Sequence, residues 1–210
     1  MNSFDQRKKD ILSKEDKSSK GKWDERIIAL CDKLNSFENY YSTSSCSGRI
    51  IVMKDEEQKG PGLFEFVSHE LVDFDEFFNE FSSKLLTSQI AETRPTLPNS
   101  KESSKKINSK NNLKFKQDSV ILHVACREIL DAKKLLDKGL KSGFKKSGII
   151  SLGKNIIVEL NLSDKLEFPL IEEGKLLVGE EFLKKVLERS NDNLEKGWER
   201  IEDLIKEIGK

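Results

Sequence analysis

A polar segment near the middle of the chain constrains the fold most. Residues Glu92 to Asn112 are rich in Ser, Lys, Asn and Pro and show no hydrophobic periodicity. Such a segment buries too little apolar surface to offset the entropy lost on ordering, so we interpret it as a flexible connection. The core of this 210-residue chain must be built from the parts on either side. At this length we expect one domain, residues 1–210, with 92–112 as an internal loop.

Hydrophobic periodicity predicts helices and strands on both sides of this loop. Helical spacing marks a short segment in the first twenty residues and the ranges 24–35, 73–86, 127–142 and 179–208. Short apolar runs predict strands at 48–53, 63–71, within 113–126, at 149–152 and 155–160, and an edge strand at 167–170. The pattern predicts an α+β fold with a mixed, largely antiparallel sheet flanked by helices.

Two further features refine this expected architecture. The chain has no glycine-rich strand–turn–helix of the doubly wound type, so we do not expect a Rossmann methyltransferase. Ser47-Gly48 and Ser147-Gly148 each precede a predicted strand. This short echo raises the hypothesis of two similar halves, with the two Ser-Gly turns brought near each other.

Composition indicates a soluble protein of the cytoplasm. No apolar run approaches the roughly 20 residues that a membrane helix needs, and no apolar signal segment follows Met1. We therefore expect no membrane association. The three cysteines, an odd number at wide spacing, form no disulfide framework.

Charge is unevenly distributed, although 37 basic and 37 acidic residues balance. Residues 101–116 hold six lysines and one acid, and residues 133–154 hold seven lysines and one acid. Residues 65–80, in contrast, carry six acids and no lysine or arginine. Two basic stretches on a neutral chain favour a localised anionic partner, for which nucleic acid is the natural candidate.

The run from Ser42 to Arg49, Ser-Thr-Ser-Ser-Cys-Ser-Gly-Arg, leads directly into apolar residues 50–53. Hydroxyls, backbone N–H groups and a guanidinium are the groups that proteins use to hold a phosphate or a carboxylate. A polar turn ahead of a strand would explain the serines equally well. The additional cysteine and arginine make this run a candidate binding site.

The remaining candidates for chemistry are two histidines, His69 and His123, and the thiols of Cys46 and Cys126. Cys46 with a histidine could form a nucleophile and base, and the four residues could in principle ligate zinc. Neither arrangement has the local spacing of a known motif, and we expect no metal site. A histidine on a strand is also often structural.

Several segments together resemble one family. The run Thr43 to Ile50 resembles the signature of the tRNA wybutosine-synthesizing methyltransferase family, the third protein of that pathway. Other pieces match in the same order: residues 12–21, His69, residues 122–127, residues 143–149, Asn191 and Arg200-Ile201. The resemblance spans nearly the whole chain and is closest to a stand-alone archaeal form. The segment 92–112 departs from it by being longer and more polar.

The resemblance implies a methyl transfer from S-adenosylmethionine to N4 of a tricyclic guanosine derivative beside the anticodon of phenylalanine tRNA. The ring N–H must lose its proton, so the reaction needs a base such as His123 or His69, or solvent. The expected cofactor-binding residues are Ser44, Ser45, Cys46, Ser47, Gly48, Arg49, Arg127, Ser147 and Gly148. The expected RNA contacts are Phe144, through stacking, and Lys145 and Lys146, through phosphates.

Two other functions remain open at this point. A non-catalytic RNA-binding or scaffold module would explain the basic stretches and the missing dinucleotide-type motif. A cysteine-nucleophile hydrolase at Cys46 is a third reading.

Overall fold

The computed structural model describes residues 3–14, 24–55, 62–79 and 112–210. The chain divides into two compact units. Unit 1 comprises residues 1–49, 118–165 and 192–210, and unit 2 comprises residues 50–117 and 166–191. Each unit is therefore assembled from segments that are separated in the sequence.

Unit 1 is built on a four-stranded sheet with the order β1-β5-β7-β6. The strands are β1 (Tyr40–Cys46), β5 (Ile121–Cys126), β7 (Ile156–Asn161) and β6 (Gly148–Leu152), and all neighbours are antiparallel. The helices are α1 (Ser3–Leu12), α2 (Glu25–Asn35), α4 (Ile129–Lys141) and the long α5 (Glu180–Ile208), whose residues from 192 onward belong to this unit.

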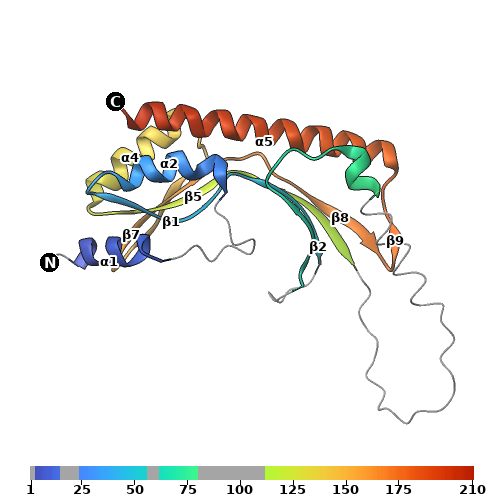
Figure 1. The fold of residues 1–210 in the computed structure, drawn as a ribbon, viewed down its shortest axis with the longest axis horizontal. Helices are drawn as coiled ribbons and strands as arrows, with labels where there is room; N and C mark the ends of the chain where they lie inside the picture. The colour runs from blue at the N-terminus through green and yellow to red at the C-terminus, as the bar shows by residue number, and fades with distance from the viewer. Residues whose placement is uncertain (1–2, 15–23, 56–61, 80–111) are drawn as a thin grey trace, which may run out of the picture. The chain divides into compact units, whose positions relative to one another are not determined.

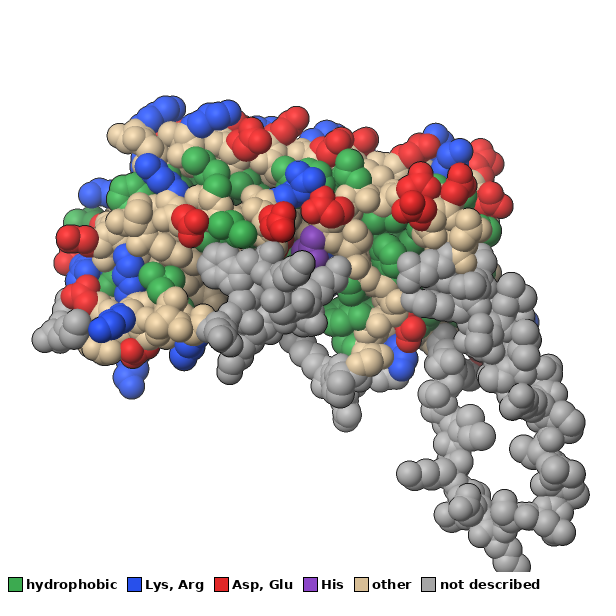
Figure 2. Space-filling view, viewed as in Figure 1, with side chains coloured by type: hydrophobic (Ala, Val, Ile, Leu, Met, Phe, Trp, Pro, Cys, Tyr) green, Lys and Arg blue, Asp and Glu red, His purple; other side chains and the backbone are tan. Residues whose placement is uncertain are grey.

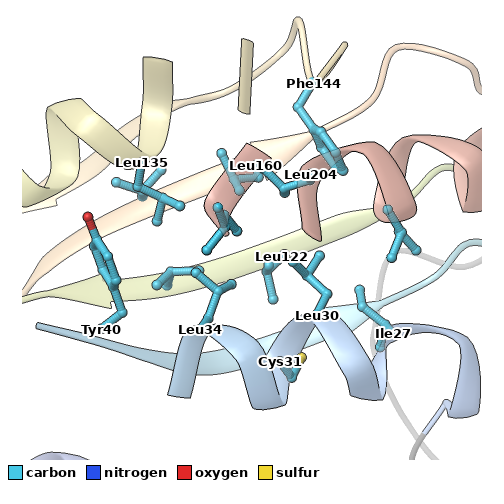
Figure 3. Close-up of a cluster of buried hydrophobic side chains, with 14 of the residues drawn as sticks. Ile27, Leu30, Cys31, Leu34, Tyr40, Leu122, Leu135, Phe144, Leu160 and Leu204 are labelled. Atoms are coloured by element: carbon cyan, nitrogen blue, oxygen red, sulfur yellow. The ribbon is translucent and has the colours of Figure 1, made fainter. Parts of the chain in front are cut away.

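One face of this sheet carries the main core. Leu122 of β5 and Leu160 of β7 point towards α2, α4 and the end of α5, where Leu30, Leu135 and Leu204 pack against them (Figure 3). All five side chains are at most 1% exposed. This burial explains the helical spacing of apolar residues in the three helices, because each turns one stripe towards the sheet.

The opposite face of the same sheet is covered at one end by α1 (Figure 1). Phe4 of α1 packs against Tyr41 of β1 and Ala125 of β5. Residues that alternate with the core residues along β5 and β7 lie on this second face. They include His123 on β5 and Glu159 on β7. Each of these two residues lies two positions along its strand from the residues that α1 covers.

Unit 2 is built on a five-stranded sheet with the order β3-β2-β4-β8-β9. Its strands are β3 (Phe64–Ser68), β2 (Arg49–Lys54), β4 (Leu113–Asp118), β8 (Leu166–Glu172) and β9 (Lys175–Leu176). Phe115 of β4 is fully buried and stacks on Phe168 of β8. The side-chain amide of Asn191 bonds both backbone groups of Val72, which precedes the helical residues 74–79.

The predicted α+β class and the largely antiparallel pairing are confirmed. Three details were wrong. The Ser42–Arg49 run is not only a polar turn, because residues 40–46 form β1. The range 113–126 holds two strands rather than one. The predicted edge strand at 167–170 is β8, which pairs with β4 on one side and β9 on the other.

Pro169 is accommodated in β8 although this strand is not at the edge of the sheet. Strand β9 pairs only with Ile171 and Glu172, which leaves the position beside Pro169 unpaired on that side.

The compact units are interleaved along the chain and do not correspond to its first and second halves. Residues 92–111 of the predicted loop, and the end of the predicted helix 73–86, lie outside the described residues. Among the described helices, none is long and apolar enough to cross a membrane.

Candidate functional site

Strand β1 distributes the polar run over two faces of the sheet of unit 1. Ser45 pairs with Leu122 and faces the core side, where its side chain hydrogen bonds the thiol of Cys31. Ser44 pairs with His123, and Cys46 with Ile121, on the second face. An irregularity between Ser42 and Ser44 adjusts this register. The predicted set Ser44–Cys46 is therefore split: Ser44 and Cys46 share a face with His123, and Ser45 does not.

A row of four residues crosses the sheet at His123. Cross-strand pairing aligns Ser44 on β1, His123 on β5, Glu159 on β7 and Gly148 on β6. His123 Nε2 and Glu159 Oε2 are 2.8 Å apart. A Cβ atom at Gly148 would meet nothing within 4 Å, so the row ends in open space on that side. Three members of the row, Ser44, His123 and Gly148, are site residues predicted from the sequence. Glu159 was not predicted.

The Ser47-Gly48 turn links β1 to β2 and is held from two directions. The backbone N–H of Ser47 donates to Asp24 Oδ2 at 2.6 Å. Asp24 is the N-cap residue of α2, but its side chain makes no capping bond there. Gly48 has φ of +98°, and a Cβ atom would lie 2.8 Å from Leu194 and 3.1 Å from the carbonyl oxygen of Asp118. The turn therefore requires glycine at this position.

Two polar groups of this turn stand out. The Ser47 hydroxyl is fully buried and has no hydrogen-bond partner among the residues that the structure describes. A buried hydroxyl without a partner is costly, which makes it a candidate donor for a bound ligand. Arg49, the first residue of β2, donates from Nε to Asp118 Oδ2 at 3.1 Å, and both side chains are largely shielded from solvent.

The chemistry of Cys46 does not favour a nucleophile. Burial raises the pKa of its thiol, while a hydrogen bond from the Gly48 backbone and the charge of Arg49 act in the opposite direction without overcoming it. A nucleophilic cysteine instead needs a lowered pKa. Cys126 lies on the core side of β5, where burial raises the pKa of its thiol to about 12. The Cys126 thiol therefore faces away from His123, so these two residues cannot ligate the same zinc ion.

The Ser147-Gly148 turn lies in the same unit but at the other edge of the sheet. Three strand spacings of about 4.8 Å separate β1 from β6, about 14 Å in all. The Ser147 hydroxyl donates to the carbonyl oxygen of Phe144 at 2.7 Å and accepts from the N–H of Asn161 at 3.0 Å. The two Ser-Gly turns thus flank the row at opposite ends.

The three predicted RNA contacts differ in exposure. Lys145 and Lys146 are exposed in the turn that follows α4. Phe144 is 0% exposed and belongs to the hydrophobic core, as Figure 3 shows. Its predicted stacking on a base was wrong, because both faces of the ring are already covered by protein. The glycine and lysines around it are typical of an exposed turn, and this masked its packing role.

Arg127 lies away from the row. Cys126 pairs with Tyr40, so Arg127 follows β5 at the end where β1 begins, four residues or about 13 Å along the strand from His123. Its guanidinium forms an ion pair with Asp5, donates to the carbonyl oxygen of Glu38 at 2.9 Å and lies 4.7 Å from the ring centroid of Phe4. These contacts hold α1 against the sheet. His69 belongs to unit 2, immediately after β3.

Three acidic residues of the site were missed by the sequence analysis: Asp24, Asp118 and Glu159. Glu159 had the clearest signal, because it is an acid flanked by Val158 and Leu160 in a predicted strand. Such an alternation places the acid on the face opposite the core. Its pairing with His123 could not be read from the sequence, since the strand order was unknown.

The chain is similar to known proteins over nearly its whole length. A family model described as "Methyltransferase TYW3" matches residues 6–210. A protein of Pyrococcus horikoshii named tRNA(Phe) 7-((3-amino-3-carboxypropyl)-4-demethylwyosine(37)-N(4))-methyltransferase 1 is 36% identical over 98% of this chain and 94% of its own length. The Methanocaldococcus jannaschii protein named for the same activity is 32% identical over 95% and 93% of the two chains.

The similarity extends to a human protein and to solved structures. The human tRNA wybutosine-synthesizing protein 3 homolog is 32% identical over 93% of this chain and 68% of its own length. The structure of PH1069 protein from Pyrococcus horikoshii superposes with a TM-score of 0.76 at 33% identity, covering 98% of this chain and 95% of that one.

Proposed function

The chain belongs to the TYW3 methyltransferase family, and from this premise we propose that it methylates N4 of the demethylwyosine-type base of phenylalanine tRNA. The observation that carries the proposal is the similarity over nearly full length to archaeal proteins named for this activity. The alternative, an RNA-binding module without catalysis, is not favoured by a family of methyltransferases. The base is expected beside the anticodon.

The expected methyl donor is S-adenosylmethionine, and the donor set of unit 1 fits it. A methionine carboxylate needs N–H or O–H donors, which the partnerless buried hydroxyl of Ser47 and the guanidinium of Arg49 supply. The ligand's positive ammonium and sulfonium groups need anionic partners. Asp24 and Asp118 are the candidates, because both lie near Cys46 and raise the pKa of its thiol. When bound, S-adenosylmethionine supplies an electrophilic methyl group on a positively charged sulfur.

The residues of the row would perform the remaining tasks. N4 carries a proton that must leave during methylation, and His123 is the candidate acceptor. Ser44 lies beside His123 on the neighbouring strand, where its exposed hydroxyl can hydrogen bond the substrate base. Much of the acceleration in an in-line displacement comes from such positioning.

The expected RNA surface is the exposed lysines of α4 and the following turn, namely Lys133, Lys134, Lys141, Lys145 and Lys146. One acid, Asp137, lies among these lysines, so the surface keeps an excess of positive charge that would track the phosphates of an anticodon loop. The long α5 is a weaker candidate, because basic and acidic side chains are interspersed along it (Figure 2).

The direct test is transfer of a labelled methyl group from S-adenosylmethionine to phenylalanine tRNA. The substrate is tRNA carrying the tricyclic base without its N4 methyl group, and nucleoside mass spectrometry locates the product. We expect one methyl group per tRNA at N4. Unmodified transcript of the same sequence is the matched substrate control, and it should accept none.

A cysteine-to-serine variant at position 46 separates the proposal from a hydrolase. Because methyl transfer needs no thiolate from the protein, Cys46→Ser should retain transfer. Salt-dependent tRNA binding by the unaltered protein without any methyl incorporation, alongside an active archaeal relative as positive control, would instead establish the non-catalytic module.

A further inference from the structure

Glu159 occupies an unusual position for an acid. It lies in the middle of the sheet of unit 1, between β5 and β6, with its side chain about a quarter exposed. Both carboxylate oxygens have partners: Oε2 lies 2.8 Å from His123 Nε2, and Oε1 accepts from Asn161 Nδ2 at 3.3 Å. A carboxylate fixed at both oxygens has a defined orientation. The imidazole that it contacts is therefore fixed in orientation as well.

Asn161 is held by a further set of bonds. Its Nδ2 faces Glu159, because an ionised carboxylate only accepts hydrogen bonds. Its Oδ1 lies 3.2 Å from the Ser119 hydroxyl, which is also 3.0 Å from the carbonyl oxygen of Leu162. Its backbone N–H donates to the Ser147 hydroxyl, and its carbonyl oxygen accepts from the N–H of Lys146. Ser119 and Asn161 are 5% and 8% exposed. The support behind Glu159 is thus buried and lies at the end of β7, where it joins β7 to the segments that precede β5 and β6.

The protonation of the pair follows from these contacts. The hydrogen bond from His123 and that from Asn161 hold the pKa of Glu159 below its usual value, against the opposing effect of burial, and Lys165 adds a weaker attraction. The neighbours of this pair in the row, Ser44 and Gly148, carry no charge. At neutral pH Glu159 is ionised and can only accept, so Nε2 of His123 must carry a proton.

We propose that Glu159 is a positioning residue that fixes the Nε2–H tautomer of His123 and thereby makes Nδ1 the proton acceptor in methyl transfer. The proposal rests on the proposed function. The lone pair of N4 forms the bond to the methyl carbon as the carbon–sulfur bond breaks, and the pair of that bond stays on sulfur. The proton of N4 passes to Nδ1, and the resulting imidazolium faces the carboxylate of Glu159 until solvent removes the proton.

The first test reads the tautomer in the protein alone. Long-range ¹H–¹⁵N spectra of labelled protein distinguish Nε2–H from Nδ1–H imidazoles. We expect Nε2–H at His123 in the unaltered protein. In Glu159→Gln we expect a mixture of tautomers, because the amide can donate or accept towards Nε2. An Nδ1–H imidazole in the unaltered protein would overturn the proposal whatever the activity.

The second test reads catalysis. In Glu159→Gln we expect kcat to fall roughly ten- to a hundredfold, a part of the ~10²–10⁴ that a general base contributes. KM for tRNA and the affinity for S-adenosylmethionine should be unchanged. Glu159→Asp, which keeps the charge, should recover part of kcat. Glu172→Gln, an exposed strand position on β8, is the matched control and should behave like the unaltered protein.

The outcomes separate the two proposals. A fixed Nε2–H tautomer with an unchanged kcat in folded Glu159→Gln would show that the pair is only structural. Absence of methyl transfer by the unaltered protein would remove the proposed function and with it the role of Glu159 in the reaction, while the tautomer measurement would still stand. If Glu159→Gln fails to give a folded amide spectrum, Glu159→Asp carries both measurements.

Discussion

At the scale of single residues, the same side-chain types serve different purposes according to the face on which they lie. Ser44 is exposed beside His123, whereas Ser45 contacts a core thiol and the Ser47 hydroxyl is buried with no partner in the described part of the chain. Cys46 and Cys126 both have raised thiol pKa values, yet they lie on opposite faces of the sheet. Residue identity alone therefore does not define the candidate site, because register decides which groups meet.

Gly48 gives a residue-scale prediction about stability. Alanine at this position would combine an unfavourable positive φ with close contacts to Leu194 and Asp118. We expect Gly48→Ala to lower the free energy of unfolding by roughly 1–3 kcal/mol, measured by urea denaturation. Gly153→Ala is the matched control, because nothing lies within 4 Å of its Cβ position and its φ is not positive. Equal stability of the two variants would contradict the close packing of this turn.

At the scale of elements, α1 is attached to unit 1 by a compact set of contacts. Phe4 is 5% exposed against Tyr41, and Lys8 donates to the carbonyl oxygen of Phe37. Arg127 adds the ion pair with Asp5 and a cation–π contact with Phe4. The Arg127 guanidinium also holds the pKa of Asp5 below its usual value. Arg127 therefore connects the end of β5 to a helix that is distant in sequence.

This attachment predicts different effects for two variants. Arg127→Ala removes the ion pair and the ring contact, so we expect faster amide hydrogen exchange throughout α1. Asp5→Asn removes only the ion pair and should have a smaller effect. Exchange measured by mass spectrometry checks both.

The same pair of variants tests Arg127 as a cofactor-binding residue. If Arg127 acts only through α1, calorimetric titration with S-adenosylmethionine should give the same affinity in both variants. A tenfold or greater loss in Arg127→Ala alone would instead place its guanidinium on the cofactor.

At the scale of the whole molecule, stability depends on keeping ionisable groups neutral in the core of unit 1. Burial raises the pKa of Tyr40 to about 12 from an ordinary value of 10.0, and Asp131 adds to the effect. Burial also raises the pKa of Cys126 to about 12 from 9.0, again with a contribution from Asp131. Both groups stay protonated in the folded protein under conditions where they ionise in the unfolded chain.

This difference predicts a loss of stability at high pH. Between about pH 9 and 12 the unfolded chain binds fewer protons than the folded protein, so the free energy of unfolding falls as pH rises. The expected slope is on the order of 1 kcal/mol per pH unit for each group. Urea denaturation at several pH values under reducing conditions measures it. The double variant Tyr40→Phe/Cys126→Ala should show a shallower slope, and an identical slope would assign the effect to other residues.

The sequence by itself determined the elements and the family. Apolar spacing predicted the helices 25–35, 129–141 and 180–208 to within two residues at each end, because a helix that covers a sheet must present a continuous apolar stripe. The ordered motifs around Cys46, His69, His123 and Ser147 identified the family. Strand β1 was missed, because its polar residues 42–45 lack the apolar alternation that marks a strand.

Only the tertiary structure decided which of these residues act together. Strand order and register place Ser44, His123, Glu159 and Gly148 in one row, although more than a hundred residues separate the first from the last. Packing of the turn after α4 places Phe144 in the core, and register places Arg127 at the far end of β5. The physical reason is that pairing between distant strands is set by the burial of whole sheet faces. Local sequence encodes the alternation of each strand but not the identity of its neighbour.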